Sequence, residues 1–220
     1  MSTEIDNREA ERALLLELLN PNDEQGRRKT ALLEATFDVI AEVGFEGLRT
    51  RSVAERAGVN IATLHYYFPS KQALIEGLAQ FLGAKFVALH GPAPEPSGYP
   101  ALDALRQEFS DGNYYQEHQP KMLIVMQEFA LRGKRDSEVE KIVEMMYGYW
   151  RRNLEEVVSA GLADGSFRPG LNLQVTQVML MCVLSGAMSC RGDEFRQLQR
   201  GVERWLLRKE VWEATRGVKQ

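Results

Sequence analysis

Apolar positions recur at helical spacing through most of the chain, and this pattern predicts an all-α protein. It predicts a helix over residues 1–20 and then, between residues 27 and 90, four helices, at 27–43, from about 50, from about 60, and at 71–90. Beyond a proline-rich loop at 91–98 it predicts five more, at roughly 100–112, 119–132, 137–163, 172–191 and 194–208. No stretch alternates apolar and polar residues between turns as a half-buried strand does. We therefore expect a small N-terminal helical unit followed by a larger C-terminal helical bundle.

The segment 49–68 has the layout of two short helices joined by a tight turn. Gly58 interrupts the apolar pattern, and glycine tolerates the positive φ that a sharp reversal needs. Asn60 is a suitable N-cap for the second helix, because its side-chain oxygen can accept an unpaired backbone N–H. Leu64 and Phe68, four residues apart, share the inward face of that helix. This arrangement predicts a helix-turn-helix.

The outward face of the second helix suggests what the motif contacts. At helical spacing Ala62, Thr63 and Tyr66 point away from the core, with His65 and Tyr67 on the flanks. The face carries no acidic side chain, so the helix can enter a major groove without repelling phosphate. Taken alone, the geometry also fits an ordinary helical hairpin at the surface.

Charge is distributed unevenly along a chain whose formal net charge is -4. Residues 1–26 hold two basic and seven acidic side chains and form a predicted acidic, helical N-terminal extension. Residues 27–75 hold seven basic and five acidic side chains. The mildly basic segment is therefore the one that contains the helix-turn-helix, as nucleic-acid binding favours.

Several classes of protein find no support in the sequence. The N-terminus lacks the basic region and apolar run of a signal peptide, and polar residues interrupt the uncharged segment 169–190, so we expect a cytoplasmic protein with no membrane span. Cys182 and Cys190 fit buried, reduced thiols. The three histidines show no metal-ligand spacing, and we find no catalytic motif. We expect no metal, no cofactor and no enzymatic activity.

The residues Val43-Gly-Phe-Glu-Gly-Leu-Arg-Thr-Arg-Ser-Val-Ala-Glu-Arg-Ala-Gly-Val-Asn-Ile-Ala-Thr-Leu-His-Tyr-Tyr-Phe-Pro-Ser-Lys-Gln-Ala-Leu74 resemble the TetR family of bacterial transcriptional regulators. The resemblance is specific from Arg28 to about Leu78. It implies an N-terminal three-helix helix-turn-helix domain at 27–73 and a bundle at 74–220 for ligand binding and dimerisation. It also implies a homodimer that represses by binding a palindromic double-stranded DNA operator, and release by a small-molecule effector.

The same resemblance implies which residues contact DNA. These are Thr50 and Arg51 at the start of the first short helix, the recognition-helix residues Ala62, Thr63, His65, Tyr66 and Tyr67, and Lys71 at the start of the next helix. Arg51 is the candidate for base readout, because its guanidinium can bond guanine O6 and N7 together. An intramolecular or phosphate contact is the alternative. His65 departs from the family, which usually has tyrosine at this position, so an imidazole replaces the phenol in the contact made there.

Methionine-rich stripes in the bundle suggest a deformable apolar pocket for a largely apolar effector. The candidate ligand-binding residues are Met122, Met126, Phe129, Met145, Tyr149, Asn153, Met179 and Cys182. Asn153 or Tyr149 is the candidate for orienting hydrogen bonds. Ordinary core packing is the alternative for each stripe.

The opposite face of the uncharged helix and the last predicted helix offer further apolar surface. One helix cannot bury two apolar faces in a single small bundle, so we expect both helices to pair with their symmetry mates in a homodimer. The candidate interface residues are Met181, Ser185, Met188, Leu198, Val202 and Trp205. The alternatives are a DNA-binding activator, a ligand-independent repressor whose bundle only dimerises, and an adaptor that binds no DNA.

Overall fold

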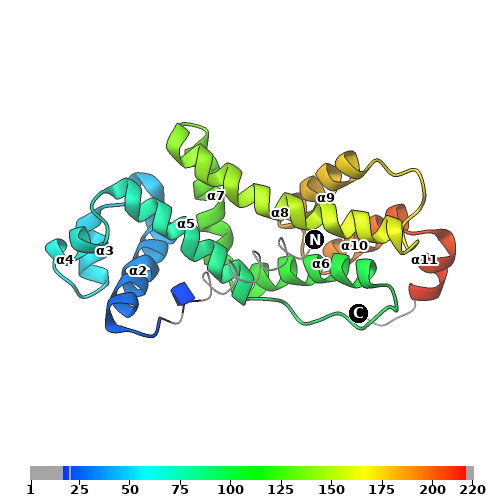
Figure 1. Cartoon of the computed structure of the whole chain (residues 1–220), viewed down its shortest axis with the longest axis horizontal. Coiled ribbons are helices and arrows are strands. Elements are labelled where there is room, and N and C mark those ends of the chain that lie inside the picture. Colours follow the sequence, from blue (N-terminus) through cyan, green and yellow to red (C-terminus); the bar gives the residue numbers. More distant parts are fainter. Residues whose placement is uncertain (1–16, 20, 217–220) are drawn as a thin grey trace. The chain divides into compact units, whose positions relative to one another are not determined.

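The computed structural model describes residues 17–19 and 21–216, and it confirms the expected all-α fold (Figure 1). The N-terminal helix expected over 1–20 lies almost wholly outside these residues, although 17–19 are helical. Within the described part no strand forms, and a single antiparallel bridge pairs Phe167 with Leu207.

The first four helices follow the expected pattern of caps and turns. They are α2 (Glu24–Gly47), α3 (Thr50–Arg56), α4 (Ile61–Tyr67) and α5 (Lys71–Ala88). Asp23 caps α2 by accepting the Gly26 N–H at 2.6 Å, and Ser70 caps α5 by accepting the Ala73 N–H at 3.0 Å. These contacts satisfy N–H groups that the first helical turn leaves unpaired.

Six further helices follow in the described part of the chain, and their bounds differ in places from those expected. They are α6 (Pro100–His118), α7 (Pro120–Gly133), α8 (Ser137–Ala163), α9 (Leu173–Ala187), α10 (Asp193–Leu206) and α11 (Lys209–Thr215). Helix α6 continues past Gly112, where the expected helix ended. A Cβ at Gly112 would lie 2.8 Å from the Met188 methyl group, so glycine serves close packing there. Helix α11 was not expected from the sequence.

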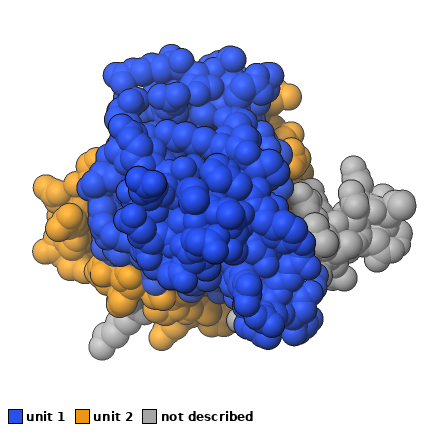
Figure 2. Space-filling view, turned by 90° about the vertical axis from the view of Figure 1, so that its left-hand side faces the viewer, with its two compact units in different colours: residues 1–89, 119–146 blue, residues 90–118, 147–220 orange. Residues whose placement is uncertain are grey.

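The chain folds as two compact units, coloured blue and orange in Figure 2. Unit 1 comprises residues 1–89 and 119–146, and unit 2 comprises residues 90–118 and 147–220. Unit 1 therefore includes α7 and the first part of α8 in addition to the helix-turn-helix. The predicted domains 27–73 and 74–220 divide the chain by sequence, and this division stays a prediction.

Unit 1 has an apolar core built mainly from α2 and α5. Leu32, Leu33 and Ile40 on α2 are fully buried, as are Leu74 and Phe81 on α5. The helix-turn-helix is packed in the same unit, where Leu64 of α4 is also fully buried. Support of this kind is what a recognition helix needs to present its outer face in one orientation.

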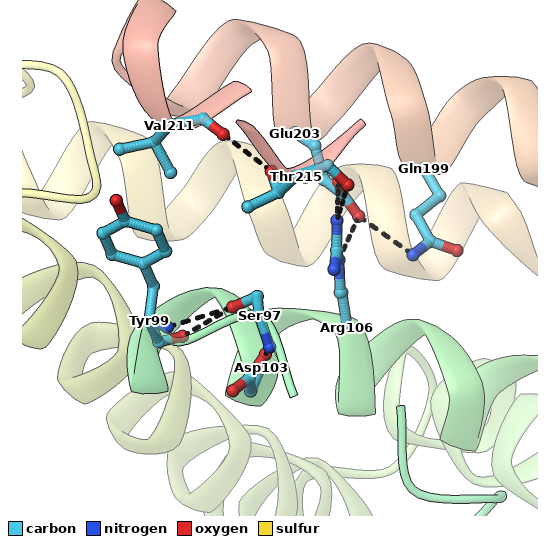
Figure 3. Close-up of polar contacts among 8 residues, drawn as sticks. All are labelled: Ser97, Tyr99, Asp103, Arg106, Gln199, Glu203, Val211 and Thr215. Carbon is cyan, nitrogen blue, oxygen red and sulfur yellow. Dashed lines mark hydrogen bonds and ion pairs between the residues drawn. The ribbon is translucent and has the colours of Figure 1, made fainter. Parts of the chain in front are cut away.

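Unit 2 combines an apolar core with one buried ion pair. Phe109, Leu154 and Phe167 are fully buried. Beside them Arg106 of α6 forms a two-pronged pair with Glu203 of α10, at 3.0 and 2.9 Å (Figure 3). Gln199 donates to the same carboxylate at 3.1 Å. Arg106 Nη2 also donates to the backbone carbonyl of Thr215 in α11 at 3.5 Å, so one side chain joins α6, α10 and α11.

Candidate nucleic-acid interface

The two short helices α3 and α4 meet through a turn whose details follow from its sequence. Gly58 has φ of +69°, and the next residue, Val59, donates its N–H to the Ala54 carbonyl at 3.0 Å. Asn60 caps α4 by accepting the Thr63 N–H at 2.8 Å. Val53 is fully buried in α3. The predicted turn and cap are therefore both present, and they fix the angle between the helices.

Helix α4 buries one side and exposes the side that was predicted to contact DNA. Ala62, His65 and Tyr66 are exposed, with 71% of Tyr66 accessible, while Thr63 and Tyr67 are half-buried. The Tyr66 and Tyr67 rings meet edge to face with centroids 5.1 Å apart. Two hydroxyl-bearing rings thus stand together at the surface, where they can donate hydrogen bonds to phosphate oxygens.

The start of α3 presents Arg51 beside the same surface. Arg51 is exposed and Thr50 is half-buried at the first position of the helix. The neighbouring Arg49 instead turns back, donating from Nη1 to the Glu46 carbonyl at 2.7 Å and to the Leu48 carbonyl at 3.2 Å. Arg51 is therefore the arginine at this end of α3 whose side chain is directed to solvent.

Lys71, at the start of α5, contacts the chain just before α3. Its ammonium group donates to the Leu48 carbonyl at 3.2 Å. Partial burial lowers the pKa of Lys71, and the nearby charges of Arg49 and Arg132 act in the same direction. The ammonium carries three protons, so one bond to Leu48 leaves donors for a phosphate. Its role as a phosphate contact stays a prediction.

Arg56 adds little free positive charge to this surface. It forms a two-pronged ion pair with Glu42 of α2, at 2.6 and 2.5 Å. The hydrogen bonds of this pair lower the pKa of Glu42 and raise the pKa of Arg56. The pair links α3 to α2, but because both side chains are exposed to solvent it contributes little to the stability of the fold.

The candidate ligand residues lie in different environments. On α7, Met122 and Phe129 are buried, and Met126 is half-buried. On α8, Met145, Tyr149 and Asn153 are exposed. On α9, Met179 and Cys182 are exposed as well. Phe129 packs edge to face on Phe45, with centroids 5.0 Å apart, so its ring already contributes to the core of unit 1. As ligand contacts these residues stay predictions.

Sequence reasoning missed a half-buried carboxylate that one of these candidates contacts. Glu108 of α6 accepts a hydrogen bond from Trp150 Nε1 at 2.8 Å and one from Asn153 Nδ2 at 2.6 Å. Burial raises the pKa of Glu108, and the charge on Asp111 adds to the effect. Helical periodicity gave no signal for this group, because its partners lie more than forty positions away on α8.

On α9 the exposed face is the one expected to line a pocket, and the face expected to meet a partner is largely covered by the chain itself. The face expected to line a pocket, which carries Val175, Met179 and Cys182, is exposed. On the face expected to meet a partner, Leu184 is buried, Met181 and Met188 are half-buried, and only Ser185 is exposed. On α10, Val202 is buried, and Leu198 and Trp205 are half-buried. Periodicity shows that a helix has two apolar faces but not which face the chain's own core covers.

Residues 17–19 and 21–216 contain no group of three or more His, Cys, Asp or Glu side chains arranged to hold a metal ion. No helix in the same ranges is both long enough and apolar enough to cross a membrane.

Comparison with known proteins agrees with the geometry of the helix-turn-helix. A family model described as "Bacterial regulatory proteins, tetR family" matches residues 32–78. The transcriptional repressor KstR2 of Mycolicibacterium smegmatis is 25% identical over 154 residues, which cover 67% of this chain and 71% of that protein. The regulator RutR of Escherichia coli is 49% identical over 47 residues, 21% of this chain and 22% of that protein.

The likeness in fold extends over most of the chain. A TetR transcription regulator from Haloarcula marismortui superposes with a TM-score of 0.67 at 17% sequence identity, covering 83% of this chain and 99% of that one. The helix-turn-helix segment, residues 32–78, is that of the TetR family of bacterial regulatory proteins. Together with the likeness to the repressor KstR2, this match supports a DNA-binding transcriptional regulator.

Proposed function

We propose that this chain is a ligand-responsive repressor that binds a palindromic operator as a homodimer. The observation that carries the proposal is the capped α3–turn–α4 unit, which presents Arg51, His65 and Tyr66 to solvent on a rigid core. Repression is the proposed mode because KstR2 of M. smegmatis is named a transcriptional repressor. Because the proposed operator lies on chromosomal DNA, we place the protein in the bacterial cytoplasm.

The proposed roles within the interface follow from chemistry and position. Arg51 reads a base edge, since its guanidinium is the side chain best suited to bond guanine at two points. Thr50, Thr63 and Tyr66 position the recognition helix by contacts to the phosphate backbone. The remaining proposed contacts are made by Ala62, His65, Tyr67 and Lys71.

The proposed homodimer is supported by the exposed apolar surface of α9. Val175 is 57% exposed, Val178 is 51% exposed and Met179 is 43% exposed. Contiguous apolar surface of this kind favours a protein partner. A second copy is the proposed partner, because a twofold dimer presents two recognition helices to the two halves of a palindrome.

The proposed effector is small and largely apolar. On α8, 62% of the surface of Met145 and 37% of that of Tyr149 is exposed, so each residue in its own unit leaves uncovered apolar area. The guanidinium of Arg152 also lies over the Tyr149 ring in a cation–π contact, 5.5 Å from the ring centroid. An effector releases DNA only as far as it binds the DNA-free conformation more tightly than the DNA-bound one.

The test is selection of duplexes from a random pool by the purified full chain, followed by footprinting. We expect two inverted half-sites whose centres lie about 34–36 Å apart, or a multiple of that distance. A panel of apolar small molecules is then added to the complex with the selected duplex. Release by one of them supports the sensor. A palindrome that no compound releases favours a ligand-independent regulator, and enrichment of no sequence contradicts DNA recognition.

A further inference from the structure

Helix α7 lies along α2 inside unit 1 and contacts it at several levels. Near its start, Lys121 Nζ pairs with Asp38 at 2.6 Å. Near its end, Glu128 reaches the backbone of Phe45, and Arg132 pairs with Glu46 at 3.1 Å. The contacts advance in the same direction on both helices, so the end of α7 lies against the turn that joins α2 to α3.

The contact with Glu128 depends on a break in α2. Gly44 has φ of +66° and ψ of -179°, outside the helical region. At this break the Phe45 N–H donates to Glu128 Oε2, at 3.0 Å. A Cβ at Gly44 would lie 2.8 Å from the same carboxylate oxygen. The positive φ and the close approach of Glu128 both require glycine here.

Two further contacts fasten the same turn. The buried ring of Phe45 packs on the buried ring of Phe129, the residue after Glu128. Arg132, one turn further along α7, holds the Glu46 carboxylate and is itself braced by Asp136 at 2.9 Å. Of the three contacts, the charge-assisted hydrogen bond from the Phe45 N–H is the one that the backbone of the turn makes itself. It therefore acts directly on the position of that backbone.

The fastened turn leads directly into the DNA-contacting end of α3. Only four residues separate Phe45 from Thr50, where α3 begins. Within them, the Leu48 carbonyl receives Lys71 Nζ at 3.2 Å and Arg49 Nη1 at 3.2 Å, and Leu48 is 1% exposed. The short span and its hydrogen bonds leave little freedom between Phe45 and Thr50, so a shift of the turn moves the start of α3.

We propose that Glu128 is a positioning residue for DNA binding. Its carboxylate accepts the Phe45 N–H. Through the Phe45–Leu48 turn, this contact fixes the position of Thr50 and Arg51 at the start of α3, on the surface that faces DNA. Helix α7 is then an element through which a displacement elsewhere in the chain changes DNA affinity. The inference rests on the proposed function, because it assigns no DNA contact to Glu128 itself.

The test compares Glu128→Ala, Glu128→Gln and the matched control Gln127→Ala, which alters the neighbouring exposed residue of α7. The probe is a duplex selected by the wild-type chain from a random pool. We expect Glu128→Ala to weaken binding roughly tenfold, the factor that corresponds to about 1.4 kcal/mol. Glu128→Gln keeps a carbonyl acceptor for the Phe45 N–H and restores most of the affinity. Gln127→Ala binds as the wild type does.

Hydrogen exchange of the Phe45 amide separates positioning from a general loss of stability. We expect faster exchange at Phe45 in Glu128→Ala, with exchange in the buried part of α5 unchanged. Wild-type affinity in Glu128→Ala together with a faster Phe45 amide overturns the proposal. Equal acceleration throughout unit 1 also overturns it. If the wild-type chain selects no duplex, the proposed function fails. A loss of DNA affinity confined to Gln127→Ala, or shared equally by all three variants, refutes only the role of Glu128.

Discussion

Arg51 and Lys71 both bring positive charge to the helix-turn-helix, but their surroundings differ. Arg51 is exposed, whereas Lys71 already donates to the Leu48 carbonyl. We expect Arg51→Ala to lose about 1–3 kcal/mol of binding free energy on the selected duplex. The variant should also discriminate less between the selected duplex and a scrambled one. Fluorescence anisotropy titrations on the two duplexes measure this. An equal loss on both duplexes shows that Arg51 contacts phosphate and not a base.

Lys71→Ala is expected to act differently, because a phosphate contact carries no sequence information. Affinity should fall by a similar factor on every duplex, and the slope of log affinity against log salt should flatten by about one released counterion. Titrations at four salt concentrations measure the slope. An unchanged slope with reduced affinity assigns Lys71 to the Leu48 carbonyl alone, with an indirect effect on α3.

Glu108 makes stability depend on pH, and the direction follows from its environment. Burial raises its pKa, against the opposing hydrogen bonds of Trp150 and Asn153 and the charge of His90. The folded chain therefore keeps this proton at pH values where the unfolded chain has lost it. The stabilisation is complete below the ordinary glutamate pKa of about 4.3, and it is lost as pH rises through the folded-state value.

Replacing Glu108 by glutamine is expected to remove this dependence. Urea unfolding of the wild type and Glu108→Gln, measured from about pH 4 to pH 7, should show the variant gaining in relative stability as pH rises. Glu144→Gln, on an exposed part of α8, is the matched control. Parallel curves for the wild type and Glu108→Gln would show that Glu108 titrates alike in both states.

At the scale of elements, the pair Arg106–Glu203 joins three helices of unit 2 (Figure 3). Both side chains are almost fully buried, at 3% and 2% exposure. Arg106→Met alone leaves a buried carboxylate without its partner and should cost about 3–5 kcal/mol. Arg106→Met combined with Glu203→Leu should recover most of that loss. Denaturant unfolding of both single variants and the double variant gives the coupling, and additive losses would contradict it.

The elements that the sequence predicts well are those with local signals. Gly58, Asn60 and Ser70 act on backbone groups within three or four residues, so the turn, the cap of α4 and the start of α5 are all readable from the sequence. The outward face of α4 follows from its inward one, because helical spacing relates the two. The exposed face of α4 was therefore predictable from helical spacing, whereas Thr50, Arg51 and Lys71 were implied by the family resemblance, and their contacts with DNA stay predictions.

Contacts between distant residues left no such signal. Glu128 lies 83 positions from Phe45, and Arg106 lies 97 positions from Glu203. Neither pair shares a helix, so no periodicity links them. For the same reason, the methionine stripe on α7 could not reveal that Met122 and Phe129 belong to the core of unit 1. Position along a helix fixes a face, and only the tertiary fold decides what that face meets.

At the scale of the whole molecule, assembly is expected to depend on the exposed face of α9. Val178→Asp places a charge among Val175, Met179 and Cys182. In a dimer, the free energy needed to desolvate this carboxylate exceeds the free energy gained from the apolar contact. We expect sedimentation at micromolar concentration to show a monomer for this variant and a dimer for the wild type. Leu131→Asp, at a site of similar exposure on α7, is the matched control.

The DNA readout distinguishes assembly from folding. A monomer keeps its own recognition helix, so Val178→Asp should bind a duplex with one half-site as the wild-type monomer does. On a duplex with two half-sites it should lose the gain that comes from binding both at once. A dimer that persists in Val178→Asp would exclude the α9 face as the interface. Equal weakening on both duplexes would show instead that the substitution disturbs the fold of the chain.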